Sequence, residues 1–347
     1  MSMIKRILAF FECIVIMFFI LSEYSIRRVN AQTNELRQKP VIIDVVLFNY
    51  EDKYISLVKQ SLEDIQKQNE GKVKLNFYDS KGNQAIQDEI LANLSRHNQD
   101  ILLVNLVDIT TAPKVIERFS QKRMPIIFFN REPVSLAPLY GKAYYVGTNA
   151  GESGELQGKI IINLWNNNRE VIDLNGDGIL EYAILRGQQT NKGAQEITKS
   201  AISTIEEAGI KTKQLEPIVA NWDRKLASED ISTLFLKYGT EVEAILANND
   251  EMAIGAVEAL QNYGYNLGDK KKTIVVVGID ATPEAQELIK KGFMAGSVFQ
   301  DPSEIAKAIY TIGMNLFEGK EPLSGTPYKF DDTGIAVRLP YGGEYIG

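Results

Sequence analysis

The segment from Asp173 to Glu181 has the residue types and spacing of a calcium-binding loop. Side-chain oxygens at loop positions 1, 3, 5 and 9 come from Asp173, Asn175, Asp177 and Glu181, and the backbone carbonyl at position 7 comes from Ile179. Position 12 of this pattern is Ile184 and not the usual bidentate glutamate. The sequence therefore predicts a structural Ca²⁺ site that needs another carboxylate from elsewhere in the chain. The alternative is a metal-free turn rich in glycine and aspartate.

A second group of polar and aromatic side chains follows the expected β-strands. Its members are residues 49–54 (with Asp52 and Tyr54), Asn130, Arg131, Glu132, Gln188, Gln189, Asn221, Trp222, Asp223, Asn248, Asn249, Asp250, Asp280 and Gln300. Open α/β sheets bind ligands beyond the carboxyl ends of their strands. Carboxylates and amides exchange paired hydrogen bonds with neighbouring hydroxyls, and Tyr and Trp rings cover apolar sugar faces. The group favours an uncharged polyol as ligand, whereas the alternative for each Asp or Asn is a simple helix N-cap.

The composition excludes several other kinds of chemistry. The 347-residue chain has a formal net charge of -7, whereas nucleic-acid binding needs a basic face. One Cys and one His are too few for an intrachain disulfide, a zinc site or a Ser–His–Asp triad. The sequence also contains no G-x-S-x-G, G-x-G-x-x-G or phosphate-loop motif. We therefore expect a binding protein that is not an enzyme and has no nucleic-acid partner.

Apolar runs of strand length alternate with helical patterns along most of the chain. Strands are expected at 41–48, 73–78, 101–106, 126–129, 181–186, 213–219, 243–247, 274–279 and 294–299. Nearly continuous apolar strands that alternate with helices indicate parallel sheets covered on both faces. We predict an α/β protein with two doubly wound parallel-sheet lobes, and one large sheet is the alternative.

The first 40 residues differ from the rest and predict export. Lys5 and Arg6 precede an apolar run from Ile7 to Leu21, the order typical of a secretory signal. The run is short for a membrane span, which needs about 20 apolar residues. Residues 1–40 are therefore either a cleaved signal peptide or a retained N-terminal anchor with a polar tether. In both cases the rest of the chain faces outside the cytoplasm.

Several segments resemble the periplasmic galactose/glucose-binding proteins, within the sugar-binding type I periplasmic binding protein family. They are Ile126–Pro133, Lys142–Thr148, Ala247–Asp250, Gly255–Leu260 and Val277–Asp280. This resemblance implies two lobes joined by a three-segment hinge that close on one sugar. The expected N-terminal lobe is 41–148 plus 300–336, and the C-terminal lobe is 149–299 plus 337–347. It also implies a monomer.

The resemblance also implies roles for individual residues. It places sugar contacts at Asp52, Tyr54, Asn130, Asn191, Trp222, Asn249, Asp280 and Gln300, and the missing calcium ligand at Glu243. Asn191, Gly193 and Ile197 stand where the family has His, Asp and Arg, and Gln300 replaces an Asn. The lost arginine would make several charge-assisted hydrogen bonds, each worth about 1.5–3 kcal/mol. We therefore predict that neither glucose nor galactose is the tightest ligand.

The family implies a receptor that delivers a monosaccharide to the permease of an ABC sugar transporter. Its place would be the periplasm or the extracellular face of the cell membrane. The open fate of the N-terminal segment leaves a second possibility, a membrane-tethered sensor of a sugar such as a pentose. Its partner would be a two-component histidine kinase or a chemoreceptor. A sugar-responsive repressor is disfavoured, because an apolar segment stands where its basic helix-turn-helix would lie.

Overall fold

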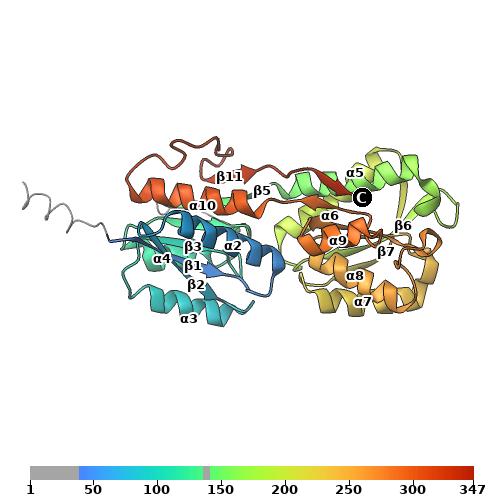
Figure 1. Cartoon of the computed structure of the whole chain (residues 1–347), viewed down its shortest axis with the longest axis horizontal. Helices are drawn as coiled ribbons and strands as arrows, with labels where there is room; N and C mark the ends of the chain where they lie inside the picture. The colour runs from blue at the N-terminus through green and yellow to red at the C-terminus, as the bar shows by residue number, and fades with distance from the viewer. Residues whose placement is uncertain (1–38, 136–140) are drawn as a thin grey trace, which may run out of the picture.

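The computed structural model describes residues 39–135 and 141–347, which form two α/β lobes side by side (Figure 1). Within these residues each lobe is built on a six-stranded sheet. The prediction of two parallel-sheet lobes is confirmed, and the single-sheet alternative is wrong. In this part of the chain no helix is long and apolar enough to cross a membrane. Residues 1–38 of the expected signal or anchor segment lie outside the described residues.

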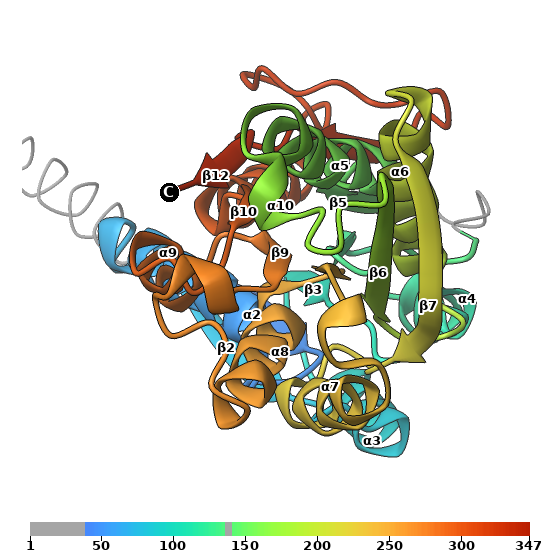
Figure 2. The same cartoon turned by 90° about the vertical axis from the view of Figure 1, so that its right-hand side faces the viewer.

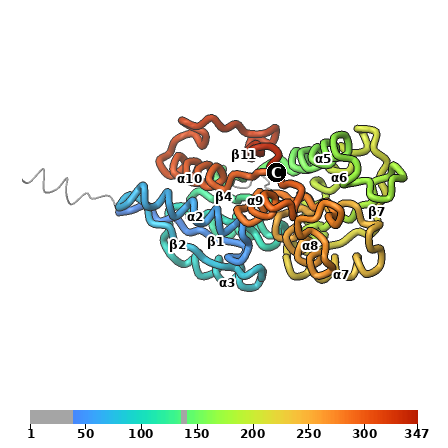
Figure 3. Tube along the Cα trace, turned by 45° about the vertical axis from the view of Figure 1, so that its right-hand side comes forward, coloured from blue at the N-terminus to red at the C-terminus, as the bar shows by residue number. Residues whose placement is uncertain are grey.

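The first lobe has a wholly parallel sheet with the strand order β11-β5-β4-β3-β1-β2. Its strands are β1 Val41–Leu47, β2 Val73–Asp79, β3 Ile101–Val104, β4 Ile126–Phe129, β5 Ala143–Thr148 and β11 Ala336–Leu339. Its helices are α2 Lys53–Gln68, α3 Gln84–Leu94, α4 Ala112–Ser120 and α10 Pro302–Phe317. Helix α10 returns late in the sequence to pack beside α2 in this lobe (Figure 3).

The second lobe has the strand order β12-β10-β9-β8-β6-β7, in which only the edge strand β12 runs antiparallel in the described residues. Its strands are β6 Ile179–Arg186, β7 Lys211–Val219, β8 Ala244–Ala247, β9 Val275–Asp280, β10 Gly296–Phe299 and β12 Glu344–Ile346. Its helices are α5 Ala150–Asn167, α6 Lys192–Glu207, α7 Arg224–Tyr238, α8 Asp250–Asn262 and α9 Pro283–Lys290. Short 3₁₀ helices span Arg169–Val171, Gly239–Glu241 and Lys270–Lys272.

Helices cover both faces of each sheet, which is why the strands are apolar almost throughout. In β1, Val45 and Leu47 pack into one core with α2 and α10, whereas Val46 packs into another with α3 and α4. In β8, Ile245 and Leu246 divide in the same way between the α7–α9 side and the α5–α6 side (Figure 2). Successive strand residues point to opposite faces, so one short apolar run contributes to two cores.

The chain crosses between the lobes at three places. The crossings lie between β5 and α5, between β10 and α10, and between β11 and β12. The third differs from the expected boundary between residues 336 and 337, because Val337, Arg338 and Leu339 pair with β5 in the first sheet. The first-lobe segment therefore continues to Leu339.

Two buried asparagines tie together the carboxyl ends of neighbouring strands. Asn105, just after β3, accepts a hydrogen bond from the Phe48 N–H (3.2 Å) and donates one to the Phe129 carbonyl (3.1 Å). Asn248, just after β8, accepts from the Gly187 N–H (3.2 Å) and donates to Thr198 Oγ1 (3.3 Å). These bonds fix the spacing of the strand ends that carry the polar residues singled out in the sequence.

Asn105→Ala should therefore lower the free energy of unfolding by about 1–3 kcal/mol, because it leaves the buried Phe48 N–H without its partner. Equilibrium urea unfolding measures the change. Asn93→Ala, on the exposed face of α3, is the matched control and should change stability by less than about 0.5 kcal/mol. Equal effects of the two substitutions would contradict the role assigned to Asn105.

Candidate functional site

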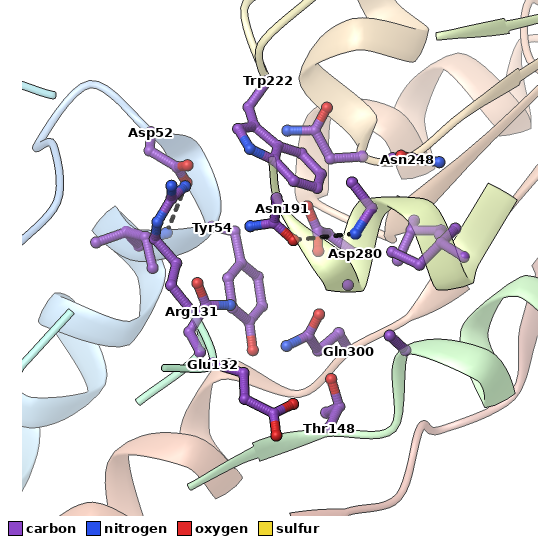
Figure 4. A pocket seen from close by; sticks show the side chains of 18 of the residues that line it. Asp52, Tyr54, Arg131, Glu132, Thr148, Asn191, Trp222, Asn248, Asp280 and Gln300 are labelled. Atoms are coloured by element: carbon purple, nitrogen blue, oxygen red, sulfur yellow. Dashed lines mark hydrogen bonds between the residues drawn. The ribbon is translucent and has the colours of Figure 1, made fainter. Parts of the chain in front are cut away.

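A pocket lies between the two lobes, at the carboxyl ends of both sheets (Figure 4). Its free space is about 860 Å³, which includes a part open to solvent. All eight residues predicted to contact a sugar line this pocket: Asp52, Tyr54 and Asn130 from the first lobe, Asn191, Trp222, Asn249 and Asp280 from the second, and Gln300 from the second crossing. Gly193 and Ile197 also line it. The structure brings the whole predicted set together, while its role in holding a ligand stays a prediction.

Three of these residues are also helix N-caps. Asp52 accepts a hydrogen bond from the Ile55 N–H (3.0 Å), and Asn191 accepts one from the Ala194 N–H (3.0 Å). Asn249 accepts one from the Met252 N–H (3.1 Å). The N-cap alternative and the pocket position therefore hold together, because a helix that starts just beyond a strand directs its cap toward the same edge of the sheet. Each cap leaves its second side-chain polar atom available to a ligand.

Several lining residues were missed by the sequence reasoning, notably Tyr145, Thr148 and Tyr341. Arg131 and Glu132 belong to the predicted strand-end group and line the pocket, although no sugar contact was assigned to them. Thr148 ends β5 at the first crossing, and Tyr341 lies in the third crossing, where their hydroxyls form a 2.8 Å hydrogen bond. No sequence periodicity marks a residue in a crossing of this kind, because its position depends on how the lobes meet.

Arg131 is the cationic side chain in the pocket wall. It is 7% exposed, and its guanidinium lies 4.4 Å from the centre of the Phe48 ring. One terminal nitrogen donates to the Val107 carbonyl at 3.0 Å and also to Gln188 Oε1 of the second lobe. Burial lowers the pKa of Arg131 to about 10, against the opposing effect of Asp52, so the group stays charged at neutral pH. Arg131 therefore spans the gap between the lobes as a cation.

Three polar atoms of the pocket wall are buried without a hydrogen-bond partner in the described part of the chain. They are Tyr54 Oη, Arg131 Nε and Trp222 Nε1. An unpaired buried donor costs about 1–3 kcal/mol. Because all three line one cavity, the wall is complementary to a ligand rich in oxygen atoms.

Carboxylates that line the pocket, or lie behind its wall, raise one another's pKa. Burial raises the pKa of Asp280 well above its usual value, and Asp250, Asp52 and Glu251 add to the effect. Asp250 accepts 2.6 Å hydrogen bonds from Ser297 Oγ and the Thr282 N–H, and its pKa is raised to about 7 by burial. Burial also raises the pKa of Asp52. This wall is therefore an environment that favours a hydrogen-bond donor or a positive charge.

The backbone is left-handed at several pocket positions that are not glycine. The φ angle is 60° at Asn130, 68° at Trp222 and 115° at Asp280. Such conformations cost about 1–3 kcal/mol each and persist where the surrounding structure enforces them. At these three residues they turn the chain just beyond a strand, so that the side chains face the pocket.

Gly187 determines where the Trp222 ring can lie. A Cβ atom on Gly187 would be 2.0 Å from Cζ2 and 2.1 Å from Cε2 of Trp222. No real Cβ approaches ring atoms so closely, so the indole occupies space that only glycine leaves open. The Gly187 N–H is itself held by Asn248. The position of the aromatic wall thus depends on the residue that follows β6.

The Asp173–Glu181 loop lies at the end of β6 away from the pocket, and the Glu243 side chain contacts its backbone. The fully buried Glu243 accepts hydrogen bonds from the Leu174 N–H (2.6 Å) and the Glu181 N–H (3.2 Å). Burial, with a contribution from Glu181, raises the pKa of Glu243 to about 7. Glu243 therefore joins the loop to β8, the strand that follows Glu243 in the sequence.

The other expected calcium ligands lie on the same loop, but they have protein partners. Asn175 Oδ1 accepts from the Asp177 N–H, and Asp177 Oδ1 accepts from the Ile179 N–H, both at 2.8 Å. Two cations also contact the loop, with Arg169 at 2.8 Å from Asp173 and Lys213 at 3.3 Å from Glu181. In the described residues no three His, Cys, Asp or Glu side chains are placed to hold a metal ion. The donor atoms are oxygens, which Ca²⁺ prefers. Binding of the ion would require Asp173 and Glu181 to break their ion pairs with Arg169 and Lys213.

Comparison with known proteins gives consistent results. The family model described as a periplasmic binding protein domain matches residues 43–321. The D-galactose/methyl-galactoside binding periplasmic protein MglB of Haemophilus influenzae is 35% identical over 303 residues, which are 87% of this chain and 88% of that protein. A putative rhizopine-binding protein of Rhizobium meliloti is 31% identical over 274 residues, which are 78% of this chain and 82% of that protein.

Among solved structures, an ABC transporter solute binding protein from Bacillus halodurans C-125 with bound myo-inositol matches with a TM-score of 0.71. It is 25% identical, and the match covers 89% of this chain and 96% of that one. These findings confirm the resemblance that the sequence segments indicate.

Gly187→Ala should displace the Trp222 ring and leave the fold in place. The chain has two tryptophans, so in a Trp165→Phe background the emission spectrum reports on Trp222 alone. We expect a shift of the emission maximum and greater quenching by acrylamide, because the ring moves out of its partly buried position. Gly151→Ala is the control, since its added Cβ would meet nothing closer than 3.4 Å. An unchanged spectrum in Gly187→Ala would contradict the tight contact.

Proposed function

Because the chain belongs to the periplasmic binding protein family, we propose that it is an exported, non-enzymatic receptor that encloses one monosaccharide or similar polyol between its two lobes. The observation that carries the proposal is the pocket at the carboxyl ends of both sheets. In the described residues its wall combines five aromatic side chains, several carboxylates and amides, and three buried polar atoms that lack a partner.

Tyr54 and Trp222 would cover the ring of the ligand. Tyr54 comes from the first lobe and Trp222 from the second, so a sugar held between them contacts both lobes (Figure 4). Their unpaired Tyr54 Oη and Trp222 Nε1 atoms would pair with ring-substituent oxygens. Asp52, Asn130 and Asn249 would exchange hydrogen bonds with hydroxyls at the rim of the ring. A ligand in this position would draw the lobes together, because each lobe supplies only part of its contacts.

The names of the relatives support a small polyhydroxylated ligand. MglB is named for D-galactose and methyl-galactoside, and the Bacillus halodurans protein holds myo-inositol. The wall formed by Asn191, Gly193 and Ile197 is uncharged, and Ile197 is 7% exposed. A hydroxyl directed at Ile197 would lose its hydrogen bond, at a cost of about 1–3 kcal/mol. We therefore keep the prediction that neither glucose nor galactose is the tightest ligand.

The proposed partner is an ABC transporter permease, to which the closed receptor would deliver its sugar as a monomer. Membership of the family supports this partner and supports a place outside the cytoplasm. The second candidate is a tethered sensor whose closed form engages a histidine kinase or a chemoreceptor. The Lys5–Leu21 segment supports it, because retention of that segment would hold the lobes at the membrane.

A thermal-shift screen of pentoses, hexoses and cyclitols tests the proposed function. At one hundred times its dissociation constant a ligand adds about 2.7 kcal/mol to the apparent stability, so at least one compound should raise the melting temperature. Trp222→Ala should abolish the shift, whereas Trp165→Phe, which alters the other tryptophan, should preserve it. The proposal fails if no compound shifts the wild-type protein and calorimetry detects no binding.

We also propose that the Asp173–Glu181 loop binds Ca²⁺ in a structural role. The side-chain oxygens of Asp173, Asn175, Asp177, Glu181 and Glu243, with the carbonyl of Ile179, would hold it. The burial of Glu243 beside Glu181 supports the proposal, because two buried carboxylates repel each other unless a cation compensates them. Lys213, which is about half exposed, gives Glu181 part of that compensation.

Removal of calcium by a chelator should lower the melting temperature of the wild-type protein. Glu243→Gln should abolish that difference, since it removes the carboxylate that connects the loop to β8. Glu241→Gln, at an exposed position two residues earlier, is the control and should retain the difference. Equal melting temperatures of the wild-type protein with and without micromolar free calcium would show that the loop is only a turn.

A further inference from the structure

We infer that the ligand of this pocket is a polyol that carries an ammonium group, held against Asp280. The inference rests on the proposed function, and it replaces the uncharged polyol suggested by residue types alone. It follows from the balance of charges in the pocket wall and from the unpaired polar atom beside Asp280.

The charged groups of the pocket wall do not cancel. Among the described lining residues, three carry a carboxylate, namely Asp52, Glu132 and Asp280, and one, Arg131, carries a positive charge. Glu132 is paired with Arg338 through two hydrogen bonds of 2.5 and 2.6 Å. Arg131 acts electrostatically on Asp52. Asp280 is therefore left facing the pocket without a cation.

The surroundings of Asp280 make this imbalance larger. Asp250, Asp52 and Glu251 are the acidic groups that act on it, and no described cation acts on Asp280 as strongly as these acids do. Glu251 has a buried, unpaired Oε1. Its neighbour Arg224 is already bonded to Glu258 (2.6 Å) and Glu284 (2.8 Å). Arg224 and Lys53 offset part of the charge of Glu251, whereas no cation of the described residues is among the main groups that act on Asp280.

Tyr54 supplies an independent sign of the missing group. The side chain is 6% exposed, its hydroxyl has no hydrogen-bond partner in the described residues, and Asp280 is the charged group that acts on it most strongly. Gln300 adjoins Asp280 through a backbone hydrogen bond of 3.2 Å. Figure 4 shows Tyr54, Asp280 and Gln300 around one part of the pocket. The Asp280 carboxylate and the Gln300 amide oxygen are acceptors in this part of the pocket, and the Tyr54 hydroxyl can accept or donate there.

An ammonium group matches these acceptors better than a hydroxyl does. It has three N–H donors and a positive charge, whereas a hydroxyl has one donor and no charge. It could donate to Asp280, Tyr54 Oη and the Gln300 amide oxygen together. Hydrogen bonds between charged groups are about twice as strong as neutral ones. An amine in place of one hydroxyl would therefore add affinity and neutralise the wall.

Calorimetry at pH 7 with matched pairs tests the inference. Each pair contains a neutral polyol and its analogue with one amino group, beginning with glucose and glucosamine, galactose and galactosamine, and myo-inositol and an aminocyclitol. The neutral sugar that binds best in the thermal-shift screen is then compared with analogues aminated at each position. We expect at least one amine to bind tighter than its neutral partner by about tenfold or more, and N-acetylation, which removes the charge, to reverse the gain.

Two variants separate Asp280 from a general effect of protein charge. Asp280→Asn should remove the preference for the amine, whereas Asp88→Asn, an equal charge change on the exposed face of α3, should retain it. If Asp280→Asn lowers the melting temperature, the comparison of neutral and aminated ligands on the wild-type protein still tests the inference. Binding of neutral sugars with no amine exceeding its partner would overturn the inference and leave the proposed function intact. Absence of binding by every compound would overturn both, and an amine preference that survives in Asp280→Asn would exclude Asp280 as its partner.

Discussion

Parallel strands impose the constraint on which the rest of this structure depends. The carboxyl ends of parallel strands all lie at one edge of a sheet, so each lobe has a single edge where loops with polar side chains collect. The three crossings join the lobes with these two edges facing each other across one pocket. Helix N-termini follow the same strands, which is why Asp52, Asn191 and Asn249 both cap helices and line the pocket.

The same constraint explains why buried polar groups concentrate near the pocket. Strand ends that meet at one edge leave backbone groups that the ladder cannot pair, and Asn105 and Asn248 take up this role in the two lobes. Left-handed residues such as Asn130 and Asp280 then turn the chain away from the sheet. These residues hold the pocket wall in place before any ligand arrives, so a ligand need not order the wall that it contacts.

Much of the fold could be predicted from the sequence, because buried parallel strands are continuous apolar runs that few other elements imitate. The third lobe boundary could not be predicted, because β11 is a four-residue edge strand without a distinctive apolar pattern. The site shows a similar division. Residues at strand ends, Arg131 among them, were found by position, whereas Thr148 and Tyr341 line the pocket at crossings whose place depends on how the lobes meet. Gly187 acts through a contact with Trp222, which only the folded chain reveals.

The unpaired atoms of the pocket wall also determine how such a receptor discriminates among sugars. Tyr54 Oη, Arg131 Nε and Trp222 Nε1 are already buried, so their loss of hydration precedes binding and is the same for every ligand. A ligand that pairs all three gains the full hydrogen-bond energy, whereas one that leaves a donor unpaired forgoes about 1–3 kcal/mol, or roughly five- to one-hundred-fold in affinity. One extra methylene group in an apolar pocket is worth a similar or smaller amount. Selectivity should therefore follow the placement of polar groups around the ring more closely than ring size.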